Sequence, residues 1–310
     1  MKSLVTATLI TSAMFASFAQ ADDSKAIQLY GKANLAVVVA DEGVDTYSDI
    51  KSHASRFGAK GEFKLDNGLT ALYVYEWQVN PDDKKDNLTA RNQYLGVKGN
   101  FGEVVIGRID TAFKKSQGKV DLFSDYKADI KNLWEGENRL ADVINFKSAS
   151  FNGFKVAATY VTEASDDPEA KPGVSLAVSY GDEKLKKSDT YFAIANDSEV
   201  DGVDATRFVA SIKLDQLKLG AIYQTEEKVD GTDELDGIFV SAAYKLGSAT
   251  LKAQYQTADQ DMGANKTSTT LGVDYKLGAA TKAYTWYSRI DNDIDGSDEG
   301  YFALGLEQKF

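Results

Sequence analysis

The chain contains no cysteine and only one histidine among its 310 residues. The absence of cysteine excludes disulfide bonds and thiol chemistry. A nucleophile–histidine catalytic arrangement would have to use His53, which sits in the polar stretch Ile50–His53, so we expect it to be a solvated side chain near a rim. The sequence also has no G-x-S-x-G, Walker or H-E-x-x-H motif. We therefore expect no enzymatic activity and no cofactor.

Long hydrophobic runs are also missing after residue 21. With no apolar stretch of about 18 residues, the rest of the chain contains no candidate membrane-spanning helix. A mean hydropathy of −0.34 still permits a membrane barrel, because lipid-facing and lumen-facing residues alternate along its strands and average out. The net charge of −12 argues against a nucleic-acid partner.

Residues 1–21 have the pattern of a secretory signal peptide. Lys2 supplies the charge, Leu4–Phe18 forms a short apolar core, and Ala19–Ala21 is an A-x-A cleavage site. A buried N-terminal helix is the alternative interpretation. We expect cleavage after Ala21 and a single β domain over residues 22–310.

Period-two alternation recurs after Lys25 and predicts half-buried strands. Leu271, Val273 and Tyr275 alternate with polar neighbours, and the same pattern occurs in 174–180, 217–224 and 251–256. We count sixteen candidate strands. Tight Gly- or Asn-containing turns alternate with longer acidic connections such as 41–49, 196–204 and 226–236. This layout is typical of an outer-membrane barrel. A soluble up-and-down barrel would bury its apolar side inward and rarely reaches sixteen strands.

The longest connection runs from Gly107 to Arg139 and is acidic, with an arginine near each end. A loop of this length is usually functional or disordered. Its four aromatic residues, Phe113, Phe123, Tyr126 and Trp134, predict that it packs against another part of the protein.

Several segments resemble the Gram-negative general porins. They are Ser55–Leu69, Arg91–Asp110, DLFSDY, Asn138–Phe154 and the C-terminal LGLEQKF, so the resemblance extends over the mature chain. It implies an all-β fold, namely a sixteen-stranded antiparallel transmembrane barrel with a long loop folded into its lumen. It further implies a homotrimer in the outer membrane, in contact with lipid and lipopolysaccharide, that lets small hydrophilic solutes and ions diffuse passively. The alternatives are a substrate-selective channel, for example for oligosaccharides, and a non-conducting barrel that acts as a receptor or adhesin.

The same resemblance assigns a pore constriction. By their matching motifs, the basic wall would comprise Lys32, Arg56, Arg108 and Arg139. The acidic side would come from the long loop, with Asp121, Asp125 and Asp129 as the first candidates and Glu135 or Glu137 as the next, although this loop lacks the Pro-Glu-Phe-Gly-Gly turn common in the family. We expect a weak to moderate cation preference from the net charge, with the wall arginines opposing it locally.

One acidic string has a metal-site pattern. Asp291–Gly296 matches the start of an EF-hand loop, but the position that should supply the closing glutamate is Phe302. We therefore interpret this string as an exposed acidic loop and predict no metal site, with weak divalent-cation binding as the alternative.

Overall fold

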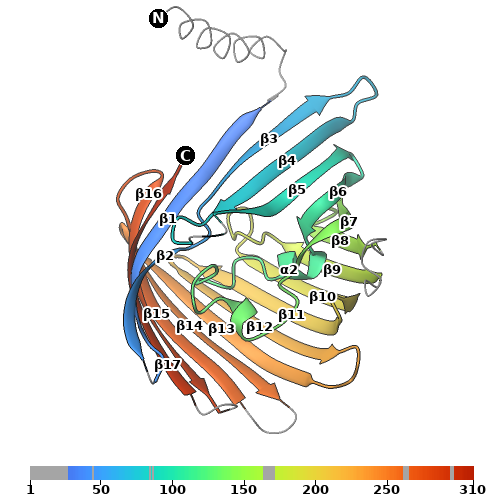
Figure 1. Ribbon diagram of the computed structural model, residues 1–310. Helices are drawn as coiled ribbons and strands as arrows, with labels where there is room; N and C mark the ends of the chain where they lie inside the picture. The colour runs from blue at the N-terminus through green and yellow to red at the C-terminus, as the bar shows by residue number, and fades with distance from the viewer. Residues whose placement is uncertain are drawn as a thin grey trace, which may run out of the picture.

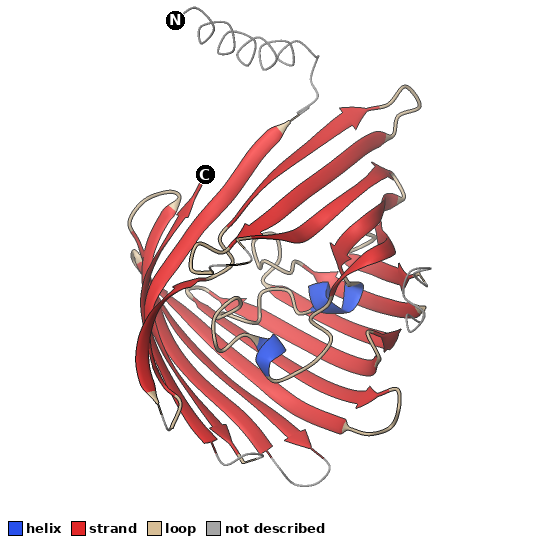
Figure 2. Ribbon diagram, in the orientation of Figure 1, coloured by secondary structure: helices blue, strands red, loops and turns tan. Residues whose placement is uncertain are grey.

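The computed structural model describes residues 27–43, 45–83, 85, 87–162, 172–260, 265–293 and 297–310. The expected signal segment, residues 1–21, lies outside this part of the chain. Antiparallel strands dominate the structure (Figure 2). The strands are β1 (Gln28–Asp41), β2 (Thr46–Ser52), β3 (Arg56–Lys64), β4 (Thr70–Val79), β5 (Leu88–Gly99), β6 (Gly102–Asp110), β7 (Arg139–Ser148), β8 (Phe154–Val161), β9 (Gly173–Gly181), β10 (Thr190–Val200), β11 (Val203–Leu214), β12 (Leu217–Lys228), β13 (Glu234–Leu246), β14 (Ala249–Gln260), β15 (Asn265–Lys276), β16 (Thr281–Asn292) and β17 (Ser297–Lys309).

The strands close into one barrel. From β3 to β17 each strand pairs with the next, and β1 pairs with β17. Strands β2 and β3 pair with successive parts of β1, so together they form one staggered barrel strand and the barrel has sixteen. At the closure, Gly31 N–H donates to the Phe310 carbonyl at 2.9 Å and Phe310 N–H donates back at 3.1 Å. The predicted fold class is confirmed.

The barrel wall is apolar on its outer side. In β9, Val174, Leu176 and Val178 are exposed, whereas Ser175 and Ala177 between them are buried. The same alternation continues around the wall. Near the C-terminus, Leu304, Leu306 and Phe310 are likewise exposed. An outer apolar band of this kind matches the hydrocarbon layer of a membrane.

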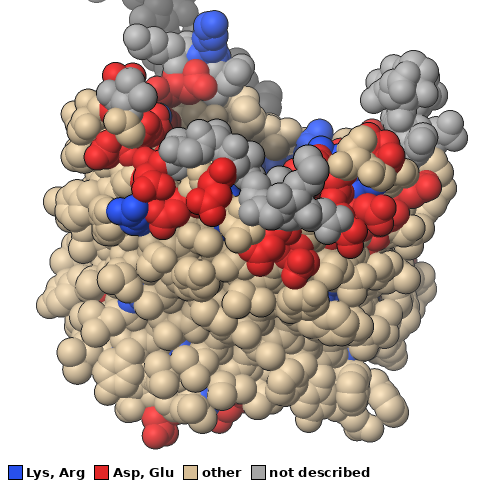
Figure 3. Space-filling model, turned by 90° about the horizontal axis from the view of Figure 1, so that it is seen from below, with Lys and Arg blue, Asp and Glu red and all other residues tan. Residues whose placement is uncertain are grey.

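Acidic side chains gather at one rim, above a wide band with few charges (Figure 3). This rim carries longer connections, such as the segment 229–233 between β12 and β13. The opposite rim carries short turns such as 215–216 and 247–248. The prediction of a long connection over 196–204 is wrong, because only Asp201 and Gly202 separate β10 from β11. Strands can extend into such polar segments because, above the bilayer, both faces of a strand can meet water.

The segment between β6 and β7 crosses the interior of the barrel (Figure 1). It contains two short helical turns, α2 (Ala112–Ser116) and η1 (Ile130–Asn132). Hydrogen bonds tie it to the inner wall at both ends: Phe113 N–H donates to Ser175 Oγ at 2.8 Å, and Trp134 Nε1 donates to the Thr257 carbonyl at 2.7 Å. We call residues 111–138 the lumen loop. Within the described residues, no helix is long and apolar enough to cross a bilayer.

Candidate pore constriction

The tip of the lumen loop meets the wall at Lys32 of β1. Asp125 adopts a left-handed backbone conformation with φ of 73°, which asparagine and aspartate tolerate better than most residues. Its Oδ2 lies 3.2 Å from Lys32 Nζ, and Glu307 of β17 lies 3.9 Å from the same ammonium group. Among the acidic loop residues predicted from the sequence, Asp125 therefore has a direct ion pair with the predicted wall residue Lys32.

Basic side chains surround this contact. Arg56 stands directly opposite Lys32 in the pairing of β1 with β3, and its Nε is 3.7 Å from Glu76. Although burial raises the pKa of the Asp125 carboxyl, the charges of Lys32, Arg56 and Arg91 together hold that pKa below its ordinary value. Asp125 thus remains ionised in this setting.

Arg91 and Glu76 belong to the same cluster and were not predicted. Arg91 Nε lies 2.7 Å from Glu76 Oε1, and its Nη1 donates to Gln78 Oε1 at 2.8 Å. A β-bulge shifts the pairing of β4 with β5 between Tyr75 and Trp77. Period-two counting assumes an unbroken register, so it gave no signal that Arg91 joins this cluster.

Arg139 and Arg108 have different surroundings. Arg139 Nη2 lies 2.9 Å from Asp110 Oδ1, and Lys114 lies 3.5 Å from the same oxygen. Arg108 donates from Nη1 to the Arg139 carbonyl at 3.2 Å. Among the described residues, no carboxylate lies within ion-pairing distance of Arg108. Arg139 therefore belongs to a charged network with Asp110 and Lys114. Arg108 contacts the backbone of Arg139 instead of a carboxylate.

The carboxylates of Asp121 and Asp129 accept hydrogen bonds from backbone N–H groups of the loop, whereas Glu135 contacts the wall through its own N–H group. Asp121 accepts hydrogen bonds from the Phe123 and Ile130 backbones at 2.8 and 3.2 Å. Burial, together with the nearby charge of Asp129, raises the pKa of Asp121 well above its ordinary value.

Asp129 accepts from the Asp125 and Lys131 backbones at 2.6 and 3.1 Å. Its carboxylate therefore shapes the tip that presents Asp125. Glu135 has an exposed side chain, and its N–H donates to the Glu226 carboxylate at 3.1 Å.

A buried ion pair that the sequence did not reveal holds the second half of the loop. Arg207 of β11 is fully buried and lies 2.7 Å from Glu137 Oε1. Its guanidinium also covers the Phe113 ring at 4.3 Å and donates to Gln224 at 2.7 Å. Within Thr206–Ala210, Arg207 is a single charged residue in an otherwise ordinary strand, so nothing in its local pattern distinguished it.

The expectation that His53 is solvated is wrong. His53 lies between β2 and β3 and is only 7% exposed. Its Nδ1 lies 3.1 Å from the Asp125 carbonyl, and the Tyr126 ring packs edge-on at 4.7 Å between ring centres. The break between the two strands is thus covered by the loop tip.

Two wall glycines allow the loop to approach the strands closely. A Cβ atom at Gly272 would come within 2.7 Å of the Phe123 ring, and one at Gly220 within 2.7 Å of Val120. Real Cβ contacts are longer than this, so side chains at these positions would push the loop away from the wall. Because glycine has no side chain, Gly272 leaves room for Phe123 and Gly220 leaves room for Val120.

Comparison with known proteins agrees with the barrel fold. The family model described as Gram-negative porin matches residues 6–295, so the chain belongs to the Gram-negative porin family. The major outer membrane protein P.IB of Neisseria meningitidis is 24% identical over 291 residues, which are 86% of each chain.

Two solved structures illustrate the shared fold. The anion-selective porin from Comamonas acidovorans has a TM-score of 0.74 and 18% identity, over 92% of this chain and 99% of its own. The trimer form of Vibrio cholerae OmpT has a TM-score of 0.70 and 18% identity, over 93% and 100% respectively. The protein is a porin of the outer membrane, a channel for passive diffusion.

Proposed function

We propose that small hydrophilic solutes and ions cross this channel through a constriction between Asp125 and the basic wall of Lys32, Arg56 and Arg139. The observation that carries the proposal is the Lys32–Asp125 contact at 3.2 Å, which joins the loop tip to the wall. Arg91 and Glu76 extend the charged ring beside it. Asp121 and Asp129 hold the tip in shape, and Arg108 supports Arg139 through its backbone carbonyl.

The constriction works by geometry and electrostatics, with no enzymatic step and no cofactor. The loop sets the width of the passage, and the facing charges create a field across it that orients dipolar solutes. The lumen aromatics Tyr284 and Trp286 are each 2% exposed and pack against Tyr126. Because they are covered by the loop, they do not form an exposed aromatic path of the kind expected for an oligosaccharide channel.

Single cysteines test which side chains line the passage, because the natural chain has none. We would make Asp125→Cys, Arg139→Cys and Arg108→Cys separately and add a charged methanethiosulfonate reagent during planar-bilayer recording. The first two variants should lose conductance upon labelling, and Arg289→Cys at the outer rim should not. Unchanged current after confirmed labelling of Asp125→Cys would remove this residue from the constriction.

We further propose that the protein assembles as a homotrimer, supported by the trimer form of the Vibrio porin of the same fold. Its outer surface would contact outer-membrane lipid, and its acidic loops would meet lipopolysaccharide. Insertion into a bilayer in groups of three equal conductance steps, together with a cross-linked trimer band, is the expected result. Single steps from a cross-link-free monomer would contradict it.

Processing after Ala21 is also proposed. N-terminal sequencing of the outer-membrane form should begin Asp-Asp-Ser-Lys. A mature chain that keeps Lys2 would show that the segment is not removed.

A further inference from the structure

A second charged region lies at the short-turn end of the lumen, on the other side of the loop from the acidic rim. It is a cavity of about 820 Å³ that reaches up to Lys32 of the constriction. Its lining includes nine lysines, Lys32 among them, but only five aspartates and glutamates. The chain as a whole has the reverse balance, with 35 basic and 47 acidic residues. We call this cavity the lysine vestibule.

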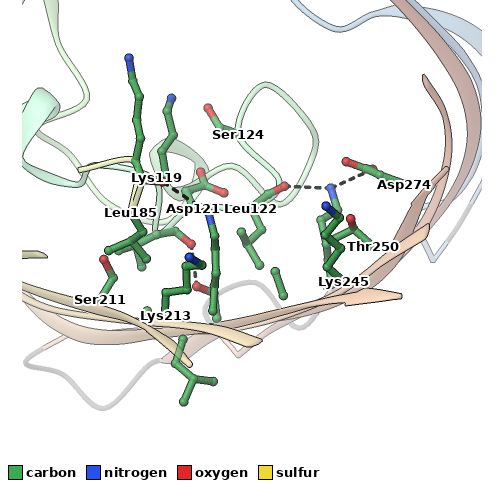
Figure 4. Close-up of a pocket in the computed structure, with 18 of the residues that line it drawn as sticks. Lys119, Asp121, Leu122, Ser124, Leu185, Ser211, Lys213, Lys245, Thr250 and Asp274 are labelled. Carbon is green, nitrogen blue, oxygen red and sulfur yellow. Dashed lines mark hydrogen bonds and ion pairs between the residues drawn. The ribbon is translucent and has the colours of Figure 1, made fainter. Parts of the chain in front are cut away.

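The lysines approach the cavity from different elements. Lys119 comes from the lumen loop, whereas Lys213 and Lys245 come from the barrel wall (Figure 4). Lys213 and Lys218 are directly opposite each other in the pairing of β11 with β12. Like charges in that position destabilise a sheet, so folding alone gives no reason for this pair.

Most of the acidic lining is already engaged. Asp274 lies 3.1 Å from Lys252 and 2.9 Å from Lys282, and Glu307 lies 3.2 Å from Lys309. Asp121 is buried within the loop and accepts two backbone hydrogen bonds. These carboxylates therefore offer little compensation to the remaining lysines.

Four lining lysines stay without such compensation. In the part of the chain that the structure describes, no carboxylate lies within ion-pairing distance of Lys119, Lys186, Lys218 or Lys245. Lys218 Nζ donates to the Lys184 carbonyl at 3.3 Å. Ammonium groups held together in a protein-walled cavity raise the local concentration of anions.

We propose that the lysine vestibule is a binding site for small multivalent anions, entered from the periplasmic mouth. Short turns mark the periplasmic end of outer-membrane barrels, and the vestibule is lined by the turn residues Asp215 and Gln216. A lysine ammonium is a point charge rather than a planar fork. The site should therefore recognise the number of negative charges, in phosphate or carboxylate form, more than the geometry of the anion.

The inference deepens the channel function, and planar-bilayer recording tests it with inorganic triphosphate as the probe. Asp230→Cys in the β12–β13 loop, labelled from one chamber with an impermeant thiol reagent, identifies the mouth that faces that chamber. Triphosphate added at the periplasmic mouth should reduce the current at about one-tenth of the concentration needed at the outer mouth. Citrate should act similarly, and acetate should not.

The double variant Lys218→Gln/Lys245→Gln isolates the site. It should raise the half-blocking concentration from the periplasmic mouth about tenfold, since two favourable charge contacts are lost. Lys187→Gln is the matched control, because Lys187 lies in the same turn as Lys186 but does not line the cavity. Equal block from both mouths, or equal block of the double variant and the natural protein, would overturn the inference.

Calorimetric titration of the detergent-solubilised protein with triphosphate separates this inference from the channel function. Binding that weakens in Lys218→Gln/Lys245→Gln supports the vestibule site even if no current is recorded. Normal conductance with no measurable binding overturns the site while leaving the channel intact. Folding of each variant is checked by the heat-dependent mobility of the barrel on gels.

Discussion

In the proposed constriction, the contact between Asp125 and Lys32 is the one that would set the properties of the wide barrel. Both side chains are largely buried, at 26% and 10% exposure, yet the pair lies where the loop meets the wall. A unit charge about 4 Å from a passing ion contributes about 1 kcal/mol in bulk water and about 4 kcal/mol at an effective dielectric of 20. A narrow protein-walled passage lies between these limits, so individual charges here should affect selectivity measurably.

Replacing Arg139 with serine should raise the cation-to-anion permeability ratio several-fold, because a positive charge leaves the wall and Asp110 loses its closest cation. From the sequence alone we expect the same of Arg108→Ser. The structure makes its effect smaller, since Arg108 contacts the Arg139 carbonyl and no described carboxylate. Reversal potentials in a salt gradient measure both changes, with Arg289→Ser as the outer-rim control. If all three variants behave alike, neither wall arginine contributes to the constriction.

The pH dependence of selectivity should show when Asp125 loses its charge. Its pKa lies below the ordinary value of 3.8. The stabilising effect of its ion pair with Lys32 is therefore complete above that ordinary value and is lost as pH falls through the lowered pKa. Between pH 8 and 5 the contribution of Asp125 should be constant, and below about pH 4 anion permeability should rise.

Asp125→Asn provides the comparison for this titration. The variant should already show the raised anion permeability at pH 7. It should lack the further rise in anion permeability that protonation of Asp125 causes in the natural protein at acid pH. Glu135→Gln, on the same loop but with an exposed side chain, should retain the rise in anion permeability at acid pH. A difference between natural protein and Asp125→Asn that disappears near pH 6 would contradict the lowered pKa.

The lumen loop is held as a unit by contacts spread over much of the wall. Its backbone and side chains bond to β9, β13 and β14, and glycines at 220 and 272 leave room for Val120 and Phe123. The buried Arg207–Glu137 pair fixes the returning end. Contacts at so many points should restrain the motion of the loop relative to the barrel wall.

Glu137→Leu should loosen the loop. Arg207 would remain buried without its carboxylate, and breaking such a pair costs about 3–5 kcal/mol. We expect larger current fluctuations at constant voltage and a lower unfolding temperature, while the barrel still forms. Glu135→Leu on the same loop should leave both quantities close to those of the natural protein. Equally quiet currents in the two variants would show that Arg207 and Glu137 do not restrain the loop.

The two ends of the lumen differ in their balance of charge. The outer rim carries acidic side chains (Figure 3), and the short-turn end carries the lysine vestibule (Figure 4). The acidic rim therefore favours cations at the outer mouth, whereas the lysines of the vestibule favour anions at the opposite end. Selectivity should depend on which mouth faces the dilute solution.

Current should also depend on the direction of the voltage. When the outer side is positive, cations enter through the acidic mouth and anions through the basic mouth, so both accumulate in the lumen. The opposite voltage depletes both. At about 0.01 M salt, where the Debye length is about 30 Å, current should be larger with the outer side positive, and the difference should vanish near 1 M, where it is about 3 Å. Symmetric currents at low salt from oriented channels would contradict this charge layout.

The alternation of side chains along each strand was enough to predict the sixteen strands and the apolar outer face. The turn residues predicted where strands end, but not the length of every connection, since the one expected at 196–204 is a two-residue turn. These features depend on local period and turn chemistry, which a sequence displays directly. The family motifs predicted the lumen loop and suggested Lys32, Arg56 and Arg139 as wall residues of a constriction, which stays a proposal. They also pointed to a loop rich in carboxylates without distinguishing Asp125 from Asp121 and Asp129.

Contacts between distant segments could not be obtained in this way. Arg91 joins the constriction cluster across a bulge, Arg207 meets Glu137 from 70 residues away, and His53 is buried because the loop tip returns to cover it. The lysine vestibule likewise collects residues from the loop and several strands, each an ordinary charge in its own segment. Closure of the barrel brings them together, and the strength of a charge depends on the neighbours and the dielectric that closure creates.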